Sequence, residues 1–327
     1  MLDELLVQEV GLGVLFLLAF ANGANDVGKS VAPLVDDPKS LRSRSARRAL
    51  LWGGILSGLG SLSAILLSGR LFQIFTQRIV ETTPTPTFAL AALAGATGWV
   101  LIATFLKLPV STTHAIIGAI VIQAVYLYGL GNVQWSTLGL RVLLPLAGGP
   151  VVALLATYVL GGIGSRLRTK QVGESHSSLT EWGSSGATSY ARGINDAPKI
   201  AALGSFLLFG SLVTVNWFPY AIVSVAVVLG ALVLGHKVTE TVLREAPLDQ
   251  EKRLRAGFTT AALVSAGAVL GTPLSTTHMH SGAIEGTRRG LEGIVRTILK
   301  DSLLPWCVTF PLAGIFAIAV SFLAGRI

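Results

Sequence analysis

Apolar stretches long enough to cross a lipid bilayer recur along this chain of 327 residues. A transmembrane helix needs about 20 predominantly apolar residues. Charged residues make up only 13% of the chain, against about 25% in a typical soluble domain. We therefore predict an all-α polytopic membrane protein. The apolar runs lie at 49–69, 88–106, 139–163, 217–235, 256–270 and 303–325, after a first run that ends near Gly23.

Two short motifs each occur twice, in the same order and at similar spacing. They are an Asn-Asp pair and a Pro-x-Ser-Thr-Thr-His segment, found at Asn25-Asp26, 109–120, Asn195-Asp196 and 273–284. Self-similarity of this kind indicates duplicated structural units. We predict a first repeat at 1–163, a cytoplasmic linker at 164–186 and a second repeat at 187–327.

Each repeat is predicted to make three membrane crossings and to hold one re-entrant helical hairpin with Ser-Thr-Thr-His near its tip. Because three is odd, the second repeat has inverted topology relative to the first. The first helix of each repeat is expected to be broken at the Asn-Asp pair, since glycines and a proline flank it. The predicted crossings are 5–34, 49–69, 139–163, 187–212, 217–236 and 301–325, with hairpins at about 87–130 and 256–287.

The distribution of basic residues supports this topology. The loops at 35–48, 164–186, 237–255 and 288–300 hold 17 of the 25 Lys and Arg residues. The opposite loops hold only Arg70 and Arg78. Basic loops face the cytoplasm, so both termini are expected outside, and the net charge of +8 needs no nucleic-acid partner. Counting each hairpin arm as a full crossing would make the repeats parallel without moving the basic loops.

The hairpin tips carry the residue types that bind a small oxyanion. Proline ends the preceding helix, and hydroxyl groups together with free N–H groups then begin the next one, where partial positive charge favours anions. The alternative is that these side chains are ordinary helix N-caps. The predicted substrate-binding hydroxyls are Ser111, Thr112, Thr113, Ser275, Thr276 and Thr277.

The Asn-Asp pairs suggest a second kind of site. Carboxylate and amide oxygens within a membrane helix can hold a cation, or accept a proton or a substrate hydroxyl hydrogen. We assign Asn25 and Asn195 to substrate binding, and Asp26 and Asp196 to both substrate and the coupling ion or proton. The alternative is polar contact between helices.

Cationic side chains lie close in sequence to the two Asn-Asp pairs. Lys29 and Lys199 each lie three residues after the aspartate, so on a helix each shares a face with it. Arg192 stands at the position that aligns with Asn22. These three residues are predicted to neutralise the aspartates or to contact the anion, and snorkelling of the lysines to the cytoplasmic surface is the alternative.

GANDVGKS, GINDAPKI and the two STTH segments resemble the signatures of the inorganic phosphate transporter (PiT, solute carrier 20) family. The resemblance covers both halves of the chain. It implies an elevator-like secondary transporter, a homodimer, that binds phosphate between the two tips. It also implies ion and substrate roles for the two Asn-Asp pairs, and phosphate roles for the six tip hydroxyls.

Lys29 and Lys199 depart from the family signature, which has Asn at the equivalent positions; in sodium-coupled members that Asn lies beside the cation sites. A fixed ammonium would repel sodium, so the coupling ion is expected to be a proton, or the protein to be sodium-independent. Phosphate is the expected substrate because it can donate a hydrogen to an aspartate; sulfate is the alternative. An anion channel is the alternative of another class.

No motif predicts an enzyme, a metal site or a cofactor: the chain has neither a His-Glu-x-x-His segment nor a phosphate-binding Walker loop. The compact loops suggest the inner (plasma) membrane of a prokaryote.

Overall fold

The computed structural model describes residues 4–35, 43–167, 177–210, 215–245 and 249–324. Parts of the predicted loops at 35–48 and 237–255 and of the linker at 164–186 lie outside them. The first half contains α1 (Glu4–Val31), α2 (Arg44–Leu67), α3 (Gly69–Gln77), α4 (Pro86–Phe105), α5 (Thr112–Tyr128), α6 (Trp135–Thr137) and α7 (Leu144–Leu167). The second half contains α8 (Ser177–Phe209), α9 (Trp217–Glu245), α10 (Gln250–Leu270), α11 (Thr276–Arg288), α12 (Ile294–Thr297), α13 (Leu304–Cys307) and α14 (Thr309–Ala324).

The described residues form helices with short connections, and no strand is found among them. Six helical segments are long and apolar enough to cross a membrane: 5–34, 44–67, 86–105, 135–162, 217–243 and 290–323. The prediction of an all-helical multi-pass membrane protein is confirmed. The six spans differ from the six predicted crossings at two points: the predicted crossing at 187–212 is not among them, whereas 86–105, predicted to be a hairpin arm, is. The apolar run at 256–270 is also not among the six, because the helix that holds it, α10, begins with four charged residues in its first six.

The predicted break in the first helix of each repeat is wrong. α1 and α8 continue through both Asn-Asp pairs, and α8 also continues through Pro198. The flanking glycines serve close packing instead. A Cβ at Gly23 would collide with the backbone of α9, and one at Gly193 would collide with the backbone of α2. Small residues let helices approach this closely inside a membrane.

The predicted linker at 164–186 is also shorter than expected. α7 extends to Leu167 and α8 begins at Ser177, so residues at both ends of that segment are helical. The polar residues in the first turns of α8 were predicted to belong to the linker. A helix that extends beyond the apolar layer can be polar on every side, so polar composition alone does not mark the end of a helix.

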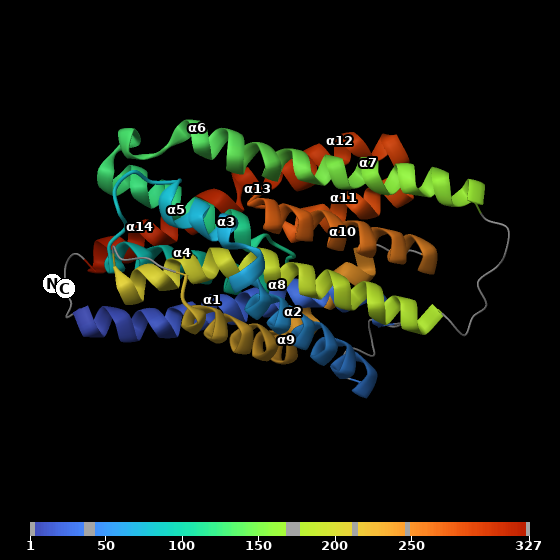
Figure 1. The fold of residues 1–327 in the computed structure, drawn as a ribbon, viewed down its shortest axis with the longest axis horizontal. Helices are drawn as coiled ribbons and strands as arrows, with labels where there is room; N and C mark the ends of the chain where they lie inside the picture. Colours follow the sequence, from blue (N-terminus) through green and yellow to red (C-terminus); the bar gives the residue numbers. More distant parts are fainter. Residues whose placement is uncertain (1–3, 36–42, 168–176, 211–214, 246–248, 325–327) are drawn as a thin grey trace.

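The two halves of the chain interlock rather than packing as separate bodies. α1 packs on α9 and α2 on α8, so the first two helices of each half exchange partners. In the same way α5 packs on α14 and α7 on α11. The α4–α5 hairpin lies toward the end of the bundle that holds both termini, whereas the α10–α11 hairpin lies toward the opposite end (Figure 1).

Related signals begin and end the hairpin helices. Thr85 caps α4 with its side chain, and Asp249 caps α10 in the same way. After α4 the chain turns at Lys107, with φ 61°, and after α10 it turns at Gly271, with φ 79°. These residues occupy equivalent places, two before Pro109 and Pro273. The left-handed conformation ends each helix and lets the chain turn into the tip.

Candidate functional site

The two hairpin tips meet inside the bundle. The Thr113 hydroxyl donates to the carbonyl of Leu274 at 3.3 Å, and the Thr277 hydroxyl donates to the carbonyl of Val110 at 3.0 Å. Each contact joins a hydroxyl of one tip to the backbone of the other, and the two contacts involve equivalent positions of the duplicated motif. The tips therefore form one continuous polar surface.

Each lysine bridges the two tips. Lys29 donates to the Thr277 hydroxyl at 2.6 Å and to the Val110 carbonyl at 2.9 Å. Lys199 donates to the Thr113 hydroxyl at 2.7 Å and to the Leu274 carbonyl at 3.0 Å. Neither ammonium reaches a membrane surface, because both side chains are buried. The alternative that these lysines snorkel is therefore wrong.

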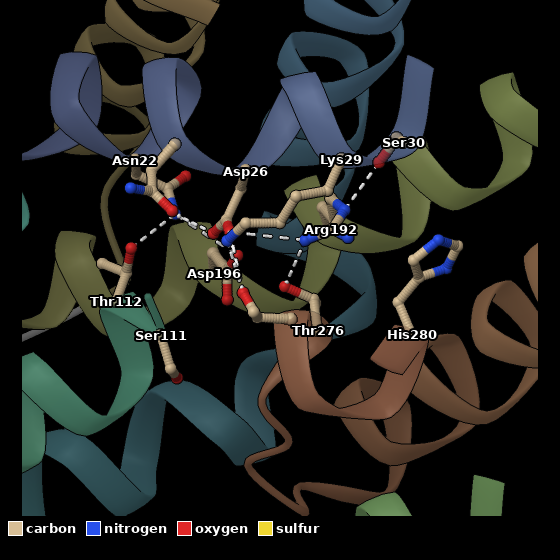
Figure 2. Close-up of polar contacts among 12 residues, drawn as sticks. Asn22, Asp26, Lys29, Ser30, Ser111, Thr112, Arg192, Asp196, Thr276 and His280 are labelled. Carbon is tan, nitrogen blue, oxygen red and sulfur yellow. Dashed lines mark hydrogen bonds and ion pairs between the residues drawn. The ribbon is translucent and has the colours of Figure 1, made fainter. Parts of the chain in front are cut away.

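Both aspartates are paired with cations. Asp26 accepts from Lys29, and the Arg192 guanidinium lies 3.4 Å from the same carboxylate oxygen. The Thr277 hydroxyl, which has one hydrogen to share between Asp26 and the Val110 carbonyl, lies 3.0 Å from each acceptor oxygen. Asp196 accepts from Lys199 at 3.1 Å. Asn22 connects the two aspartates (Figure 2), donating to Asp26 at 2.8 Å and to Asp196 at 3.4 Å.

Asn22 and Arg192, which align in the two halves, contact equivalent threonines. Asn22 donates to the Thr112 hydroxyl at 3.1 Å, and Arg192 donates to the Thr276 hydroxyl at 2.8 Å. Arg192 also donates to the Ser30 hydroxyl at 2.6 Å. No group in the described part of the chain accepts a hydrogen bond from its buried Nη2. The guanidinium thus donates to the protein through two of its nitrogens and has unused N–H donors on the third.

Asn25 and Asn195 hold the tips in place. The Asn25 amide donates to the Leu108 carbonyl at 3.0 Å, and its oxygen accepts from the Val110 N–H at 3.1 Å. The Asn195 amide donates to the Leu274 carbonyl at 2.9 Å. Each asparagine binds the tip of its own half, whereas each lysine also binds a threonine of the other half.

The charges at this centre do not cancel. Three cations face two carboxylates, so the cluster carries one net positive charge when all five groups are ionised. All five side chains are buried, with at most 4% of the surface exposed: Asp26, Lys29, Arg192, Asp196 and Lys199. Buried charge is costly in a membrane protein unless it is paired, so an excess cation here favours the arrival of an anion.

A cavity of about 290 Å³ leads to one side of this centre. Lys29 and Thr277 line its inner part. Arg288, Arg296 and Lys300, all in the basic loop at 288–300, also line it, together with the acidic residues Glu285 and Asp301. Lys199 is not among the lining residues. The cavity thus joins the charged cluster to residues of the basic loop at 288–300.

The structure separates the six predicted tip hydroxyls into two groups. The four threonines contact the charged cluster or the opposite tip, as described above. Ser111 and Ser275 instead accept from the backbone N–H of His114 and His278, each at 3.3 Å, and so act as N-caps. Figure 2 shows the Ser111 side chain pointing away from Asp26. Direct substrate contact by the two serines stays a prediction.

Sequence reasoning assigned no role to Asn22 or Ser30, although both lie in the hydrogen-bond network. The signal for Asn22 was its alignment with Arg192, while nothing local marks Ser30. No group of three or more His, Cys, Asp or Glu side chains with metal-binding geometry is found among the described residues.

Comparison with known proteins identifies the family. The model of a phosphate transporter family matches residues 22–179 and 167–317. A "Probable low-affinity inorganic phosphate transporter" of Mycobacterium bovis is 29% identical, over 90% of this chain and 72% of its own length. A protein of the same description from Rhizobium meliloti is 27% identical, over 96% of both chains.

A solved structure, "The sodium-dependent phosphate transporter", has the same fold. Its TM-score is 0.84 at 24% sequence identity, and the match covers 98% of this chain and 99% of that one. With the family model matching most of its length, the chain belongs to the phosphate transporter family.

Proposed function

We propose that this protein is a secondary active transporter that binds one phosphate between its two hairpin tips and couples transport to protons rather than sodium. One observation carries the proposal: a buried ammonium from each half bonds a tip threonine of the other half, at 2.6 Å for Lys29 and 2.7 Å for Lys199. Positive charge is thus built into the place where the tips converge.

The charge of the cluster suits a singly charged ligand. One dihydrogen phosphate would neutralise the net positive charge. Monohydrogen phosphate would do the same if one proton were bound at the same time, at Asp26 or Asp196. Either route brings the equivalent of one negative charge, which supports proton coupling without any metal ion. The Arg192 guanidinium, with its spare Nη2 donors, is the group best placed to contact the phosphate oxygens.

Electrostatics argues against sodium beside either aspartate. Lys29 already contacts Asp26, and Lys199 lies 3.1 Å from Asp196. A sodium ion about 4 Å from either ammonium would be repelled by ~4 kcal/mol at an effective dielectric of about 20. The solved relative is described as sodium-dependent; the lysines are the reason to expect a different coupling ion here.

Phosphate is favoured over sulfate by the two aspartates. A phosphate that keeps a hydroxyl hydrogen can donate it to a carboxylate, whereas sulfate has no hydrogen to donate and would face unrelieved repulsion. The proposal also includes two inverted repeats, a homodimer and a prokaryotic plasma membrane. The way helices of the two halves pack on one another supports the inverted repeats. The family resemblance supports the homodimer, and the bacterial origin of the relatives supports the prokaryotic plasma membrane.

The test uses purified protein in liposomes with labelled phosphate under an imposed proton or sodium gradient. We expect uptake that follows the proton gradient, ignores sodium and is not inhibited by excess sulfate. Uptake that requires sodium would overturn the coupling, and preferential sulfate uptake would overturn the substrate. The same assay is repeated with the double variant Lys29→Asn, Lys199→Asn. This variant should lose proton-driven uptake and gain sodium binding.

A further inference from the structure

A second cavity, of about 520 Å³, lies apart from the one that leads to the charged centre. Three elements line it: α3, the π-helical turn Leu138–Leu143 that joins α6 to α7, and the end of α10. Three arginines face it, Arg70, Arg78 and Arg141. The described part of its lining holds no acidic side chain and shares no residue with the first cavity.

These arginines stand out against the charge pattern of the whole chain. Arg70 and Arg78 are the only basic residues in the loops predicted to face away from the cytoplasm. Both line this one cavity. Arg141 joins them from the start of the third crossing. Most other basic side chains lie in the loops predicted to face the cytoplasm, as the positive-inside rule expects. That rule does not explain why these three arginines converge on one cavity elsewhere.

The helix that brings them together breaks the symmetry of the duplication. α3 follows α2 and supplies Arg70 and Gln73, and Arg78 comes directly after it. In the second half, only residues 246–249 separate α9 from α10, too few for an equivalent helix. Among the described residues, α3 therefore has no separate helix as its counterpart in the second half, and it brings two arginines to this cavity.

The cavity borders the second hairpin tip. Its lining includes Leu270, Gly271 and Thr272, the turn that leads into that tip. Leu274, two residues further on, is the residue whose carbonyl accepts from Lys199 and from Thr113. Gly271 lies against Arg70 so closely that a Cβ there would contact the arginine side chain. A shift of the turn at Leu270–Thr272 would open a path from the second cavity toward Lys199, which does not line the first cavity.

We infer that this second cavity is an outer capture site for a small oxyanion. The inference rests on the proposed function, and inorganic phosphate is the ligand it implies. Guanidinium groups bind phosphate oxygens through paired N–H donors and stay charged at every physiological pH. A cleft lined by charge of one sign raises the local concentration of its counter-ion. The site would collect the anion on the outer side and deliver it to the tips when the second tip moves.

The test compares phosphate uptake in right-side-out and inside-out membrane vesicles. The triple variant Arg70→Gln, Arg78→Gln, Arg141→Gln should raise KM about tenfold in right-side-out vesicles, the low end of the effect of charged clefts on association. Its maximal rate should stay unchanged, and its KM should no longer depend on salt. In inside-out vesicles the KM should match that of the wild type. The matched control removes three exposed arginines near the opposite end: Arg44→Gln, Arg47→Gln, Arg48→Gln.

A second measurement does not depend on transport. Phenylglyoxal modifies accessible arginines, and mass spectrometry locates the products in purified wild-type protein. Inorganic phosphate should protect Arg70, Arg78 and Arg141 but leave Arg47 reactive. An unchanged KM in right-side-out vesicles, or the absence of protection, would overturn the capture site. If wild-type vesicles take up no phosphate at all, the proposed function fails instead, and the protection experiment still decides about the cavity.

Discussion

Removing Lys199 alone should destabilise the protein more than removing Lys199 and Asp196 together. The two side chains are 3.1 Å apart and at most 5% exposed. At that separation their attraction is ~5 kcal/mol with an effective dielectric of about 20. Lys199→Met also removes donors to the Thr113 hydroxyl and the Leu274 carbonyl. Breaking a buried pair by deleting one partner typically costs about 3–5 kcal/mol, whereas replacing both is much less costly.

The measurement is unfolding by SDS in mixed micelles for the wild type, Lys199→Met, Asp196→Asn and the double variant. We expect Lys199→Met to lose about 3–5 kcal/mol, and the double variant to lose less than Lys199→Met alone, so that the coupling between the two sites exceeds the loss caused by Asp196→Asn. The double variant also keeps the net positive charge of the cluster, unlike Lys199→Met. A double variant whose loss equals the sum of the two single losses would show that the pair is not coupled, and would refute the charge balance described above.

Three further predictions concern packing, the tips and a helix cap. Gly23→Ala should destabilise the protein by about 1–3 kcal/mol through overpacking against the backbone of Val227. Gly13→Ala, which lies in the same helix and meets no neighbouring atom, should cause no loss in the same unfolding assay. Thr277→Val should lower phosphate affinity and cost about 1–3 kcal/mol, because a buried ammonium and a tip carbonyl lose a partner; unchanged binding and melting would contradict the site. Asp249→Ala should cost about 0.5–2 kcal/mol by uncapping α10. The pKa of the Asp249 carboxyl lies below its ordinary value because the lysine three residues on donates to it, so this stabilisation is present at neutral pH and lost as the pH falls through the lowered pKa; a loss that persists at low pH would show another cause.

The errors in the sequence-based prediction have a common origin. Glycine and proline beside an Asn-Asp pair were interpreted as signs of a broken helix, yet Gly23 and Gly193 allow another helix backbone to approach. Both uses require the same small residue, and only the position of the neighbouring helix distinguishes them. Likewise, the sequence allows Ser111 and Ser275 either to contact a ligand or to cap a helix. In the structure each accepts from a backbone N–H at the start of its helix and so acts as a cap.

Much of the site was identified from the chain itself. The duplicated motifs selected the tip threonines, both Asn-Asp pairs and both lysines, and alignment with Asn22 selected Arg192. All of these side chains are buried where the two tips meet, in or beside the charged cluster. The reason is that charged residues in apolar surroundings are costly and are kept where function or pairing requires them. The same residues occur at matching positions in both halves of the chain, which chance does not explain.

Hydropathy, charge and repetition are properties of the sequence alone, and they determined the membrane class, the helix content and the residue types of the buried cluster. Tertiary structure decided which groups meet. Lys29 reaches Thr277, 248 residues away, and Lys199 reaches Thr113, 86 residues away. Such contacts depend on how the two halves interlock, and no local pattern records that packing. The same packing decided that the helices stay continuous, that the serines act as caps, and that arginines from α3 and the start of the third crossing share one cavity.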